Sequence, residues 1–305
     1  MKVFFDHAIF TLQRYGGISK YIVNLVENFS KNVDPSIISL FYKNYYLKDC
    51  KYSNKLFFYN KVGPFVKVIN HINKFYFEYK IKSLKPDLIH LTYFNEEKFY
   101  KSSSKIVMTE YDLIKEKFYP KKFNSQIEFK KKLFNKVDHV ICISENTKKD
   151  LQKFYSIDNS KISVIHLAVN KSKELREKNL NLKPFILFVG ERYRYKNFEN
   201  AIKAYASSIK IHSDFDFVCF GGGKFSKIEE DLFKSLSLNR SQIHYFEGDQ
   251  LDLNYFYHKA RIFIFPSLYE GFGLPLLEAM NMECPVICSD NSCFPEIVND
   301  AAIFF

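Results

Sequence analysis

This sequence of 305 residues lacks several features, and each absence excludes a class of protein. No stretch approaches the roughly 20 apolar residues that a membrane-spanning helix needs. Asp6 places an acid too early for a secretory signal peptide. The six cysteines are scattered and form no paired C-x2-C motif, so they predict reduced thiols rather than disulfides or a zinc site. Together these features favour a cytoplasmic protein.

Metal-binding patterns are also missing. None of the eight histidines forms an H-x3-H pair, and we interpret His90, His166 and His244 as polar residues near strand ends. Asp214 and Asp216 form a D-x-D pattern that could hold a divalent metal, but it precedes its predicted strand. Ligands of parallel sheets bind beyond the carboxyl ends of strands. We therefore expect neither a metal nor another cofactor.

Negative charge is scarce in the first part of the chain. Residues 1–180 contain 33 basic and 18 acidic residues, whereas residues 181–305 contain 12 and 16. Net charge bears on partners rather than on fold. The first part is thus expected to meet an anionic partner, with a merely solvated lysine face as the alternative.

Short apolar runs alternate with segments of helical period, a pattern typical of β-α-β units and a parallel sheet. The predicted strands are 3–5, 37–42, 88–91, 105–108 and 139–143, then 185–189, 217–220, 243–246, 262–265, 286–288 and 302–305. The predicted helices include one with apolar positions from Ile18 to Phe29, one at 66–84 and one at 125–136. The fold class is therefore α/β.

A charged segment without strand signals, residues 171–178, predicts a linker between two domains, 1–180 and 181–305. Each would be a doubly wound, Rossmann-like parallel sheet, and the two would face each other across a cleft with their strand ends toward the ligand. The sequence stops at Phe305 without a helix to cover the last strand. We therefore expect the second domain to be truncated or covered by another chain.

The strongest local pattern follows the predicted strand 262–265. Gly271 and Gly273 form a turn, and Pro275 is favoured at the first position of a helix. The N–H groups at a helix start attract phosphate or sugar oxygens. Glu270 before the turn and Glu278 one turn into the helix could reach one ligand. In the plainer interpretation, Glu270 is a partner of the helix dipole and Glu278 is a solvent-facing residue.

This Glu270–Glu278 segment, with its E-x7-E spacing, resembles the nucleotide-sugar motif of glycosyltransferase family 4, which contains retaining enzymes of the two-domain GT-B fold. Further segments that resemble the family occur in its order along the chain: 13–19, 144–150, 188–192 with 195–198, 284–289 and 294–298. The resemblance implies a nucleotide-sugar donor on the second domain and an acceptor on the first.

By this resemblance Arg192 and Lys196 would bind the donor diphosphate, where two fixed cations can stabilise the leaving group without a metal. Glu270 would contact the donor sugar and Glu278 the nucleotide ribose. Further donor contacts would come from Gly16, Gly17, Gly190, Gly271, Phe272, Gly273 and Leu274. The alternative for Arg192 and Lys196 is that they are surface cations at the start of a helix. Residues 221–223 match the family's second glycine loop without the spacing of a dinucleotide site.

One segment departs from the family pattern. Family members often have a histidine in a T-x-H-D-like segment near the transferred sugar, whereas this sequence reads Thr109-Glu110-Tyr111-Asp112. Tyr111 could still donate a hydrogen bond to a sugar hydroxyl but cannot carry the charge of an imidazolium. Asp112 remains a possible polar contact of the sugar.

Two basic and aromatic segments predict contact with an anionic membrane surface from the cytoplasmic side. One is residues 65–85, and the other contains Lys121, Lys122, Lys130, Lys131, Lys132 and Lys136. The same lysines could bind nucleic acid, but no nucleic-acid-binding motif accompanies them. We therefore expect a membrane rather than a nucleic acid as the anionic partner.

The sequence thus predicts a metal-independent retaining hexosyltransferase. It would move a mannose or glucose type of sugar from a GDP- or UDP-linked donor to a polysaccharide or a lipid-linked oligosaccharide, as in lipopolysaccharide synthesis. The main alternative is a catalytically inactive or truncated GT-B subunit that binds a nucleotide sugar or a partner transferase. A basic membrane- or nucleic-acid-binding module and a GT-B sugar epimerase are the others.

Overall fold

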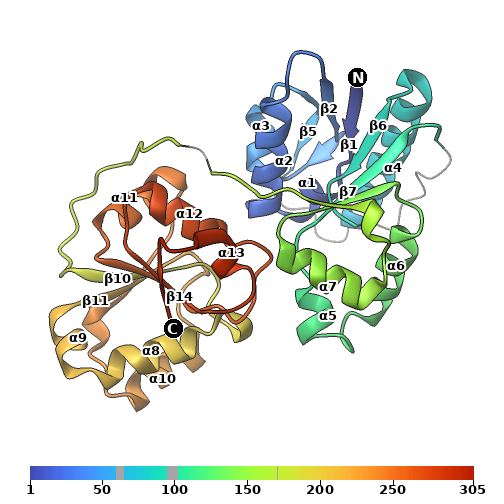
Figure 1. Ribbon diagram of the computed structural model, residues 1–305. Coiled ribbons are helices and arrows are strands. Elements are labelled where there is room, and N and C mark those ends of the chain that lie inside the picture. Colours follow the sequence, from blue (N-terminus) through green and yellow to red (C-terminus); the bar gives the residue numbers. More distant parts are fainter. Residues whose placement is uncertain (60–64, 95–101, 170) are drawn as a thin grey trace. The chain divides into compact units, whose positions relative to one another are not determined.

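The computed structural model describes residues 1–59, 65–94, 102–169 and 171–305 in two units, Met1–His166 and Leu167–Phe305 (Figure 1). Both units are parallel sheets with helices on their faces. Among the described residues, no helix has both the length and the apolar content to cross a bilayer. All six cysteines are buried as free thiols.

The described part of the first unit contains a parallel sheet in the order β4-β2-β1-β6-β7-β8-β9. Its strands are β1 (Lys2–Phe5), β2 (Asp34–Ile38), β4 (Ser53–Asn54), β6 (Leu88–Leu91), β7 (Lys105–Glu110), β8 (His139–Cys142) and β9 (Ile162–Val164), and β3 (Phe41–Tyr42) pairs separately with β5 (Phe57–Phe58). Its helices are α1 (Ala8–Leu12), α2 (Gly17–Glu27), α3 (Tyr45–Asp49), α4 (Val66–Leu84), α5 (Ile114–Phe118), α6 (Asn124–Phe134) and α7 (Glu145–Tyr155), with a 3-10 turn at Asn159–Lys161.

Alternating side chains of β1 bury the two faces of this sheet, as the two-residue period of a strand requires. Val3 and Phe5 belong to a core that also contains residues of α2, whereas Phe4 belongs to a second core with residues of α4, α6 and α7. These two apolar layers fix the loops at the carboxyl end of the sheet.

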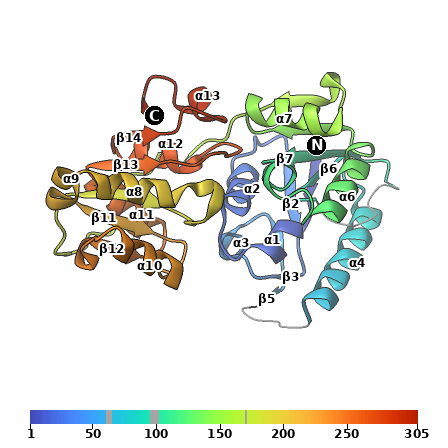
Figure 2. The same ribbon diagram turned by 90° about the horizontal axis from the view of Figure 1, so that it is seen from below.

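The described part of the second unit contains a parallel sheet in the order β12-β11-β10-β13-β14-β15. Its strands are β10 (Phe185–Val189), β11 (Asp216–Phe220), β12 (Ile243–Phe246), β13 (Ile262–Phe265), β14 (Val286–Cys288) and β15 (Ile303–Phe304). Its helices are α8 (Phe198–Ser207), α9 (Ile209–Asp214), α10 (Lys227–Ser235), α11 (Gln250–Lys259), α12 (Leu274–Asn281) and α13 (Phe294–Val298), with 3-10 turns at Arg194–Lys196 and Arg240–Gln242. Figure 2 shows helices on both sides of this sheet.

The predicted strands of both units are confirmed, with one exception. The single strand expected at 37–42 is wrong. The structure has two separate strands there, because β2 ends at Ile38 and β3 begins at Phe41. Buried Asn73 of α4 accepts a hydrogen bond from the Phe41 N–H and donates one to the Phe41 carbonyl, each at 2.8 Å. These bonds occupy the backbone groups of Phe41. In the first unit, strands β4, β5 and β9 and helices α1, α3, α5 and α7 were not predicted.

The segment expected to be a linker packs on the second unit instead. The structure divides the chain between His166 and Leu167 rather than at residue 180. Leu175, Leu180 and Leu182 pack against the core of the second unit. Arg176 and Lys178 each lie 2.8 Å from Asp252 Oδ1 of α11. The charged residues that suggested a solvated linker therefore form ion pairs.

Candidate functional site

The strand order of the second sheet reverses between β10 and β13. Successive strands from β10 run to one side of the sheet and those from β13 to the other, so the loops after these two strands part at a topological switch point. Open α/β sheets bind ligands in the crevice that forms there. Lys196 lies in the loop after β10, and Glu270 lies in the loop after β13.

Lys196 and Glu270 meet in an ion pair. The Lys196 Nζ lies 2.5 Å from Glu270 Oε1, and the two side chains retain 16% and 14% of their exposure. A backbone hydrogen bond of 2.7 Å from the Leu268 N–H to the Tyr195 carbonyl joins the same two loops. The structure thus brings together two predicted donor-site residues, at a place that solvent reaches.

The loop that carries Glu270 is held by its backbone. Ser292 Oγ donates a hydrogen bond of 2.8 Å to the Glu270 carbonyl and accepts one of 3.2 Å from the Glu270 N–H. Cys293 Sγ lies 3.3 Å from the same carbonyl. The position of the Glu270 backbone is therefore fixed without help from its carboxylate.

The glycine turn that follows gives α12 its start. Gly273 has φ of 90°, a conformation that side chains rarely adopt, and a Cβ there would lie 3.0 Å from Leu276 Cδ1. Phe272 is buried and anchors the turn. Helix α12 begins at Leu274 with Pro275 in its first turn and without a side-chain cap. Its first N–H groups are thus suited to bind an anion or a sugar hydroxyl.

Glu278 lies one turn into α12 and is half-buried. Burial, followed by the charge of Glu278, raises the pKa of the Tyr257 hydroxyl on α11 well above its ordinary value. The Glu278 carboxylate therefore lies near a buried tyrosine, a partner that the sequence did not suggest. Its contact with a ribose stays a prediction.

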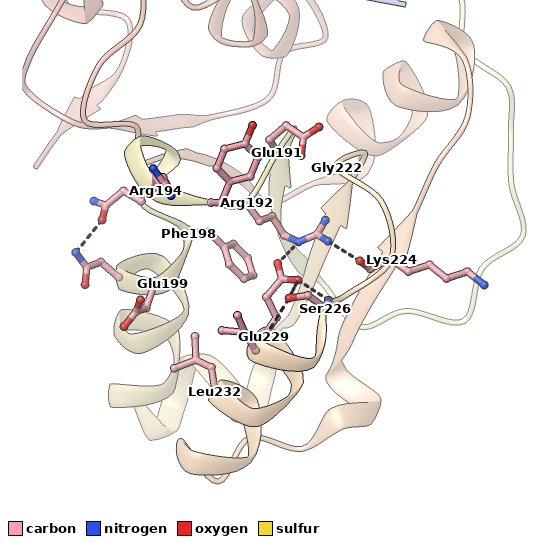
Figure 3. A pocket seen from close by; sticks show the side chains of 14 residues that line it. Glu191, Arg192, Arg194, Phe198, Glu199, Gly222, Lys224, Ser226, Glu229 and Leu232 are labelled. Carbon is pink, nitrogen blue, oxygen red and sulfur yellow. Dashed lines mark hydrogen bonds and ion pairs between the residues drawn. The ribbon is translucent and has the colours of Figure 1, made fainter. Parts of the chain in front are cut away.

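Arg192 has protein partners in this structure. It is buried, its Nε lies 2.6 Å from Glu229 Oε1, and its terminal nitrogens donate to the carbonyls of Gly221 and Gly223 at 2.9 and 2.7 Å. Hydrogen bonds from Arg192 and Ser226 lower the pKa of Glu229 against the opposing effect of burial. Figure 3 shows the guanidinium turned toward Glu229. Its diphosphate contact stays a prediction.

This arginine borders a pocket of about 610 Å³ between the start of α8 and the glycine loop before α10 (Figure 3). Gly222 lines it, and a Cβ there would lie 2.5 Å from the Gly190 carbonyl oxygen. A side chain at position 222 would therefore clash with the backbone of Gly190, so this position requires glycine. Sequence reasoning missed Glu229, although the S-x-x-E capping box that it forms with Ser226 is a recognisable signal.

In the first unit, Gly16 and Gly17 form the start of α2 as expected. The Gln13 side chain lies at this helix start, where its Oε1 accepts a hydrogen bond of 3.3 Å from the Ser19 N–H. Gln13 also lines a pocket of about 510 Å³ together with Asp112 and Lys115. The structure therefore places Asp112 on the same pocket as the glycine segment.

Tyr111 is a packing residue in this structure. Its ring is buried and lies edge-on to Tyr21 of α2 with 6.0 Å between centroids, and burial raises its pKa. Asp112 Oδ1 accepts a hydrogen bond of 3.0 Å from the Ile114 N–H at the start of α5. Sugar contacts of these two residues stay predictions.

A buried ion cluster lies next to Tyr111 and Asp112 in the chain, where β7 ends. It is here called the Lys130 cluster and consists of Lys130, Glu110, Glu116 and Tyr155. Lys130 Nζ lies 2.7 Å from Glu110 Oε1 and 2.9 Å from Glu116 Oε1. The Tyr155 hydroxyl donates to Glu116. Burial raises the pKa of Glu110 to about 7, because it outweighs the attraction of Lys130 and because Glu116 and Asp112 add repulsion. Lys130, expected on a membrane-facing surface, is therefore buried instead.

The D-x-D pattern is accounted for by local contacts. Asp216 is buried in β11 and its Oδ2 lies 3.0 Å from His244 Nε2 and accepts a hydrogen bond of 3.0 Å from the Lys183 N–H. In the part of the chain that the structure describes, no three His, Cys, Asp or Glu side chains gather as a metal ion would require.

Two doubly wound parallel sheets in one chain define the GT-B fold. The crystal structure of Anabaena Alr3699/HepE in complex with UDP and glucose shares it, with a TM-score of 0.72, 11% sequence identity and coverage of 100% of this chain and 85% of that one.

The chain belongs to glycosyltransferase family 4. The family model described as Glycosyltransferase Family 4 matches residues 15–173, and the one described as Glycosyl transferases group 1 matches residues 170–304. The O-antigen chain mannosyltransferase RfbU of Salmonella typhimurium is 31% identical over 193 residues, 61% of this chain and 53% of that protein. The O-antigen chain mannosyltransferase B of Escherichia coli is 56% identical over 52 residues, 17% of this chain and 14% of that protein. The chain thus spans about half, or less, of the length of these relatives.

Proposed function

We propose that this chain is a retaining mannosyltransferase that moves mannose from a nucleotide-sugar donor to a polysaccharide or lipid-linked oligosaccharide. The observation that carries the proposal is the Lys196–Glu270 pair at the switch point of the second sheet, in front of the uncapped start of α12. The sugar is inferred from the two O-antigen chain mannosyltransferases to which the chain is similar. A glucose-type donor is the nearest alternative.

The pair is suited to exchange one partner for another. Each side chain neutralises the other at 2.5 Å, and both remain partly exposed. A donor would give Lys196 the diphosphate as its new partner and give the Glu270 carboxylate the sugar hydroxyls, which are donors for a carboxylate. A fixed cation at the leaving oxygen then stabilises the charge that develops in the transition state.

The proposed transfer step is the one that the family resemblance implies. The bond between the anomeric carbon and the diphosphate oxygen breaks, and a bond from the same carbon to the acceptor hydroxyl oxygen forms on the same face. The acceptor proton passes to the departing phosphate, so no protein carboxylate acts as the nucleophile. Lys196 supplies the positive charge that a metal ion supplies in other transferases.

The test combines donor binding with turnover. The purified protein is melted with GDP-mannose, UDP-glucose and UDP-N-acetylglucosamine, since a ligand that binds only the folded state raises the melting temperature. Transfer of radiolabelled sugar to lipid-linked oligosaccharide is then measured with the donor that binds, with and without EDTA. We expect a shift with GDP-mannose and EDTA-resistant transfer.

Two variants and a control make this test specific. Lys196→Ala and Glu270→Gln should each lower transfer by about 10²–10³-fold, whereas Lys203→Ala on the exposed face of α8 should leave it unchanged. Donor binding without transfer to any acceptor would instead indicate a nucleotide-sugar-binding subunit. Folded protein that binds none of the donors would contradict the proposal.

A further inference from the structure

Helix α4 carries an apolar stripe on its solvent face. Five residues along the helix and at its N-terminal boundary recur at intervals of three, four, three and four: Phe65, Val68, Ile72, Phe75 and Tyr79. Their exposed fractions are 63%, 54%, 39%, 64% and 64%. This spacing places them in one row along a helix. Large apolar side chains exposed in a continuous row mark an interaction surface.

The opposite face of α4 already fulfils its structural role. Ile69, Asn73, Phe77 and Ile81 recur every four residues and are buried. Asn73 fixes the Phe41 backbone, and Phe77 and Ile81 belong to the core beneath the sheet. Figure 2 shows α4 on the outside of the first unit. The exposed stripe is therefore not needed to fold this unit.

Basic residues accompany the stripe. Residues 65–85 contain five lysines and one acid, Glu78. By the helical period, Lys67, Lys74 and Lys82 fall between the apolar row and the buried face, on the same strip as Glu78. On the other side, Lys80 Nζ lies over the Tyr76 ring at 5.4 Å. Long lysine side chains can lie along apolar surface while their charges reach outward.

We propose that this stripe docks α4 lengthwise on an anionic lipid surface. Phenylalanine and tyrosine side chains would enter the boundary between headgroups and acyl chains, and the flanking lysines would meet the anionic headgroups. A second copy of the chain fits less well, because two such helices placed face to face would bring their lysines together, and like charges repel.

The second lysine-rich segment lacks the apolar component. On α6, Leu133 and Phe134 are buried, Ile127 and Phe129 pack against the core, and Lys130 is in the buried cluster. Lys131 and Lys132 are exposed without exposed apolar neighbours on that helix. This helix therefore provides a matched control that carries the same charge change without the stripe.

The experiment is sedimentation of the whole chain with vesicles. One preparation is phosphatidylcholine, and the other is phosphatidylcholine and phosphatidylglycerol in equal amounts. We expect binding to the anionic vesicles only. The double variant Ile72→Ser with Phe75→Ser should lower this binding more than about tenfold while leaving the net charge unchanged.

The double variant Lys67→Gln with Lys74→Gln should also lower binding to the anionic vesicles by more than about tenfold. The control Lys131→Gln with Lys132→Gln should lower it by much less. Circular dichroism and melting confirm that each variant is folded. Equal loss in the stripe-charge variant and the control would overturn the proposal, as would a chain that ignores anionic vesicles.

Two further outcomes would also overturn it. If the stripe variant turned a dimer into a monomer in gel filtration without affecting vesicles, the occupant would be a second copy. If the chain bound DNA but not vesicles, the lysines would serve nucleic acid. The α4 surface belongs to the first unit and the donor site to the second, so vesicle binding and donor melting shifts can fail separately.

Discussion

Each unit has a lysine paired with carboxylate near the carboxyl end of its sheet, and the two settings differ in access to water. Lys130 retains 4% of its side-chain exposure and contacts two carboxylates. Lys196 retains 16% and contacts one. A buried charge that loses its partner has no water to replace it. Similar chemistry therefore serves a structural role in the first unit and remains open to a ligand in the second.

The largest expected effect is on the stability of the first unit. Lys130→Met should lower the free energy of unfolding by about 3–5 kcal/mol, because Glu110 and Glu116 would be left as buried carboxylates without their cation. Urea unfolding measures this. Lys131→Met, on the exposed face of the same helix, should change it by less than about 0.5 kcal/mol. Equal stability of the two variants would show that the buried cluster contributes nothing.

Removal of the exposed pair should act on catalysis instead. Lys196→Ala or Glu270→Gln should lower the transfer rate by about 10²–10³-fold, the cost of losing one preorganised charge at a transition state. The free energy of unfolding should fall by less than about 1 kcal/mol, since water can solvate the remaining partner. Steady-state kinetics with urea unfolding measures both quantities. A large loss of stability with normal transfer would mean that the Lys196–Glu270 pair has a structural role rather than a role in catalysis.

Arg192 is an intermediate case, since it lies beside the donor loops but is buried. Arg192→Lys keeps the charge but cannot hold Glu229 and two glycine carbonyls together. We expect a loss of about 1–3 kcal/mol in unfolding free energy, because buried acceptors would be left without donors. Melting with and without donor measures the change. A variant that melts normally but no longer shifts with donor would assign Arg192 to the ligand alone.

A smaller effect should appear in the pH dependence. The pKa of Glu110 is about 7 in the folded chain, above its ordinary value of 4.5. At a pH between these two pKa values, folding therefore takes up a proton. The contribution of Glu110 to the free energy of unfolding then falls as the pH rises from about 5 to 7, and it levels off above that range. Glu110→Gln lacks that loss. The variant should match the wild type near pH 5 and exceed it in stability at pH 8, as measured by urea unfolding.

The smallest effect is expected for an ion pair fully on the surface. Lys203 and Glu199 pair at 2.6 Å across one turn of α8, with side-chain exposures of 49% and 65%. Glu199→Gln should change the unfolding free energy by less than about 0.5 kcal/mol. Differential scanning calorimetry at low and high salt measures it. A larger, salt-resistant change would mean that exposure does not decide the role of these pairs.

The order of strands and helices could be predicted from the sequence, because apolar runs and helical periods are local signals. The Lys196–Glu270 meeting could be expected only from the family resemblance, since 74 residues separate the two. Burial of Lys130 had a local signal that we missed. Ile127, Lys130 and Phe134 share one helical row, so the period places the lysine on the apolar side.

Other features depend on contacts that no local pattern encodes. Arg192 pairs with Glu229 across 37 residues, and Asn73 holds the backbone of Phe41, 32 residues earlier in the chain. The charged segment at 171–178 looked solvated because its partners, Asp249 and Asp252, lie more than 70 residues later, at the start of α11. Such long-range hydrogen bonds decide which loops are rigid, and therefore which predicted site residues are held in place.

The buried cysteines allow thiol labelling to report local unfolding separately in each unit. Cys50 and Cys142 lie in the first unit, and Cys219, Cys284, Cys288 and Cys293 lie in the second. Burial raises the pKa of these thiols, so a thiol reagent meets neither an exposed sulfur nor an appreciable fraction of thiolate until the surrounding structure opens. The labelling rate of each cysteine, read by mass spectrometry of peptides, thus reports how often its own unit unfolds locally.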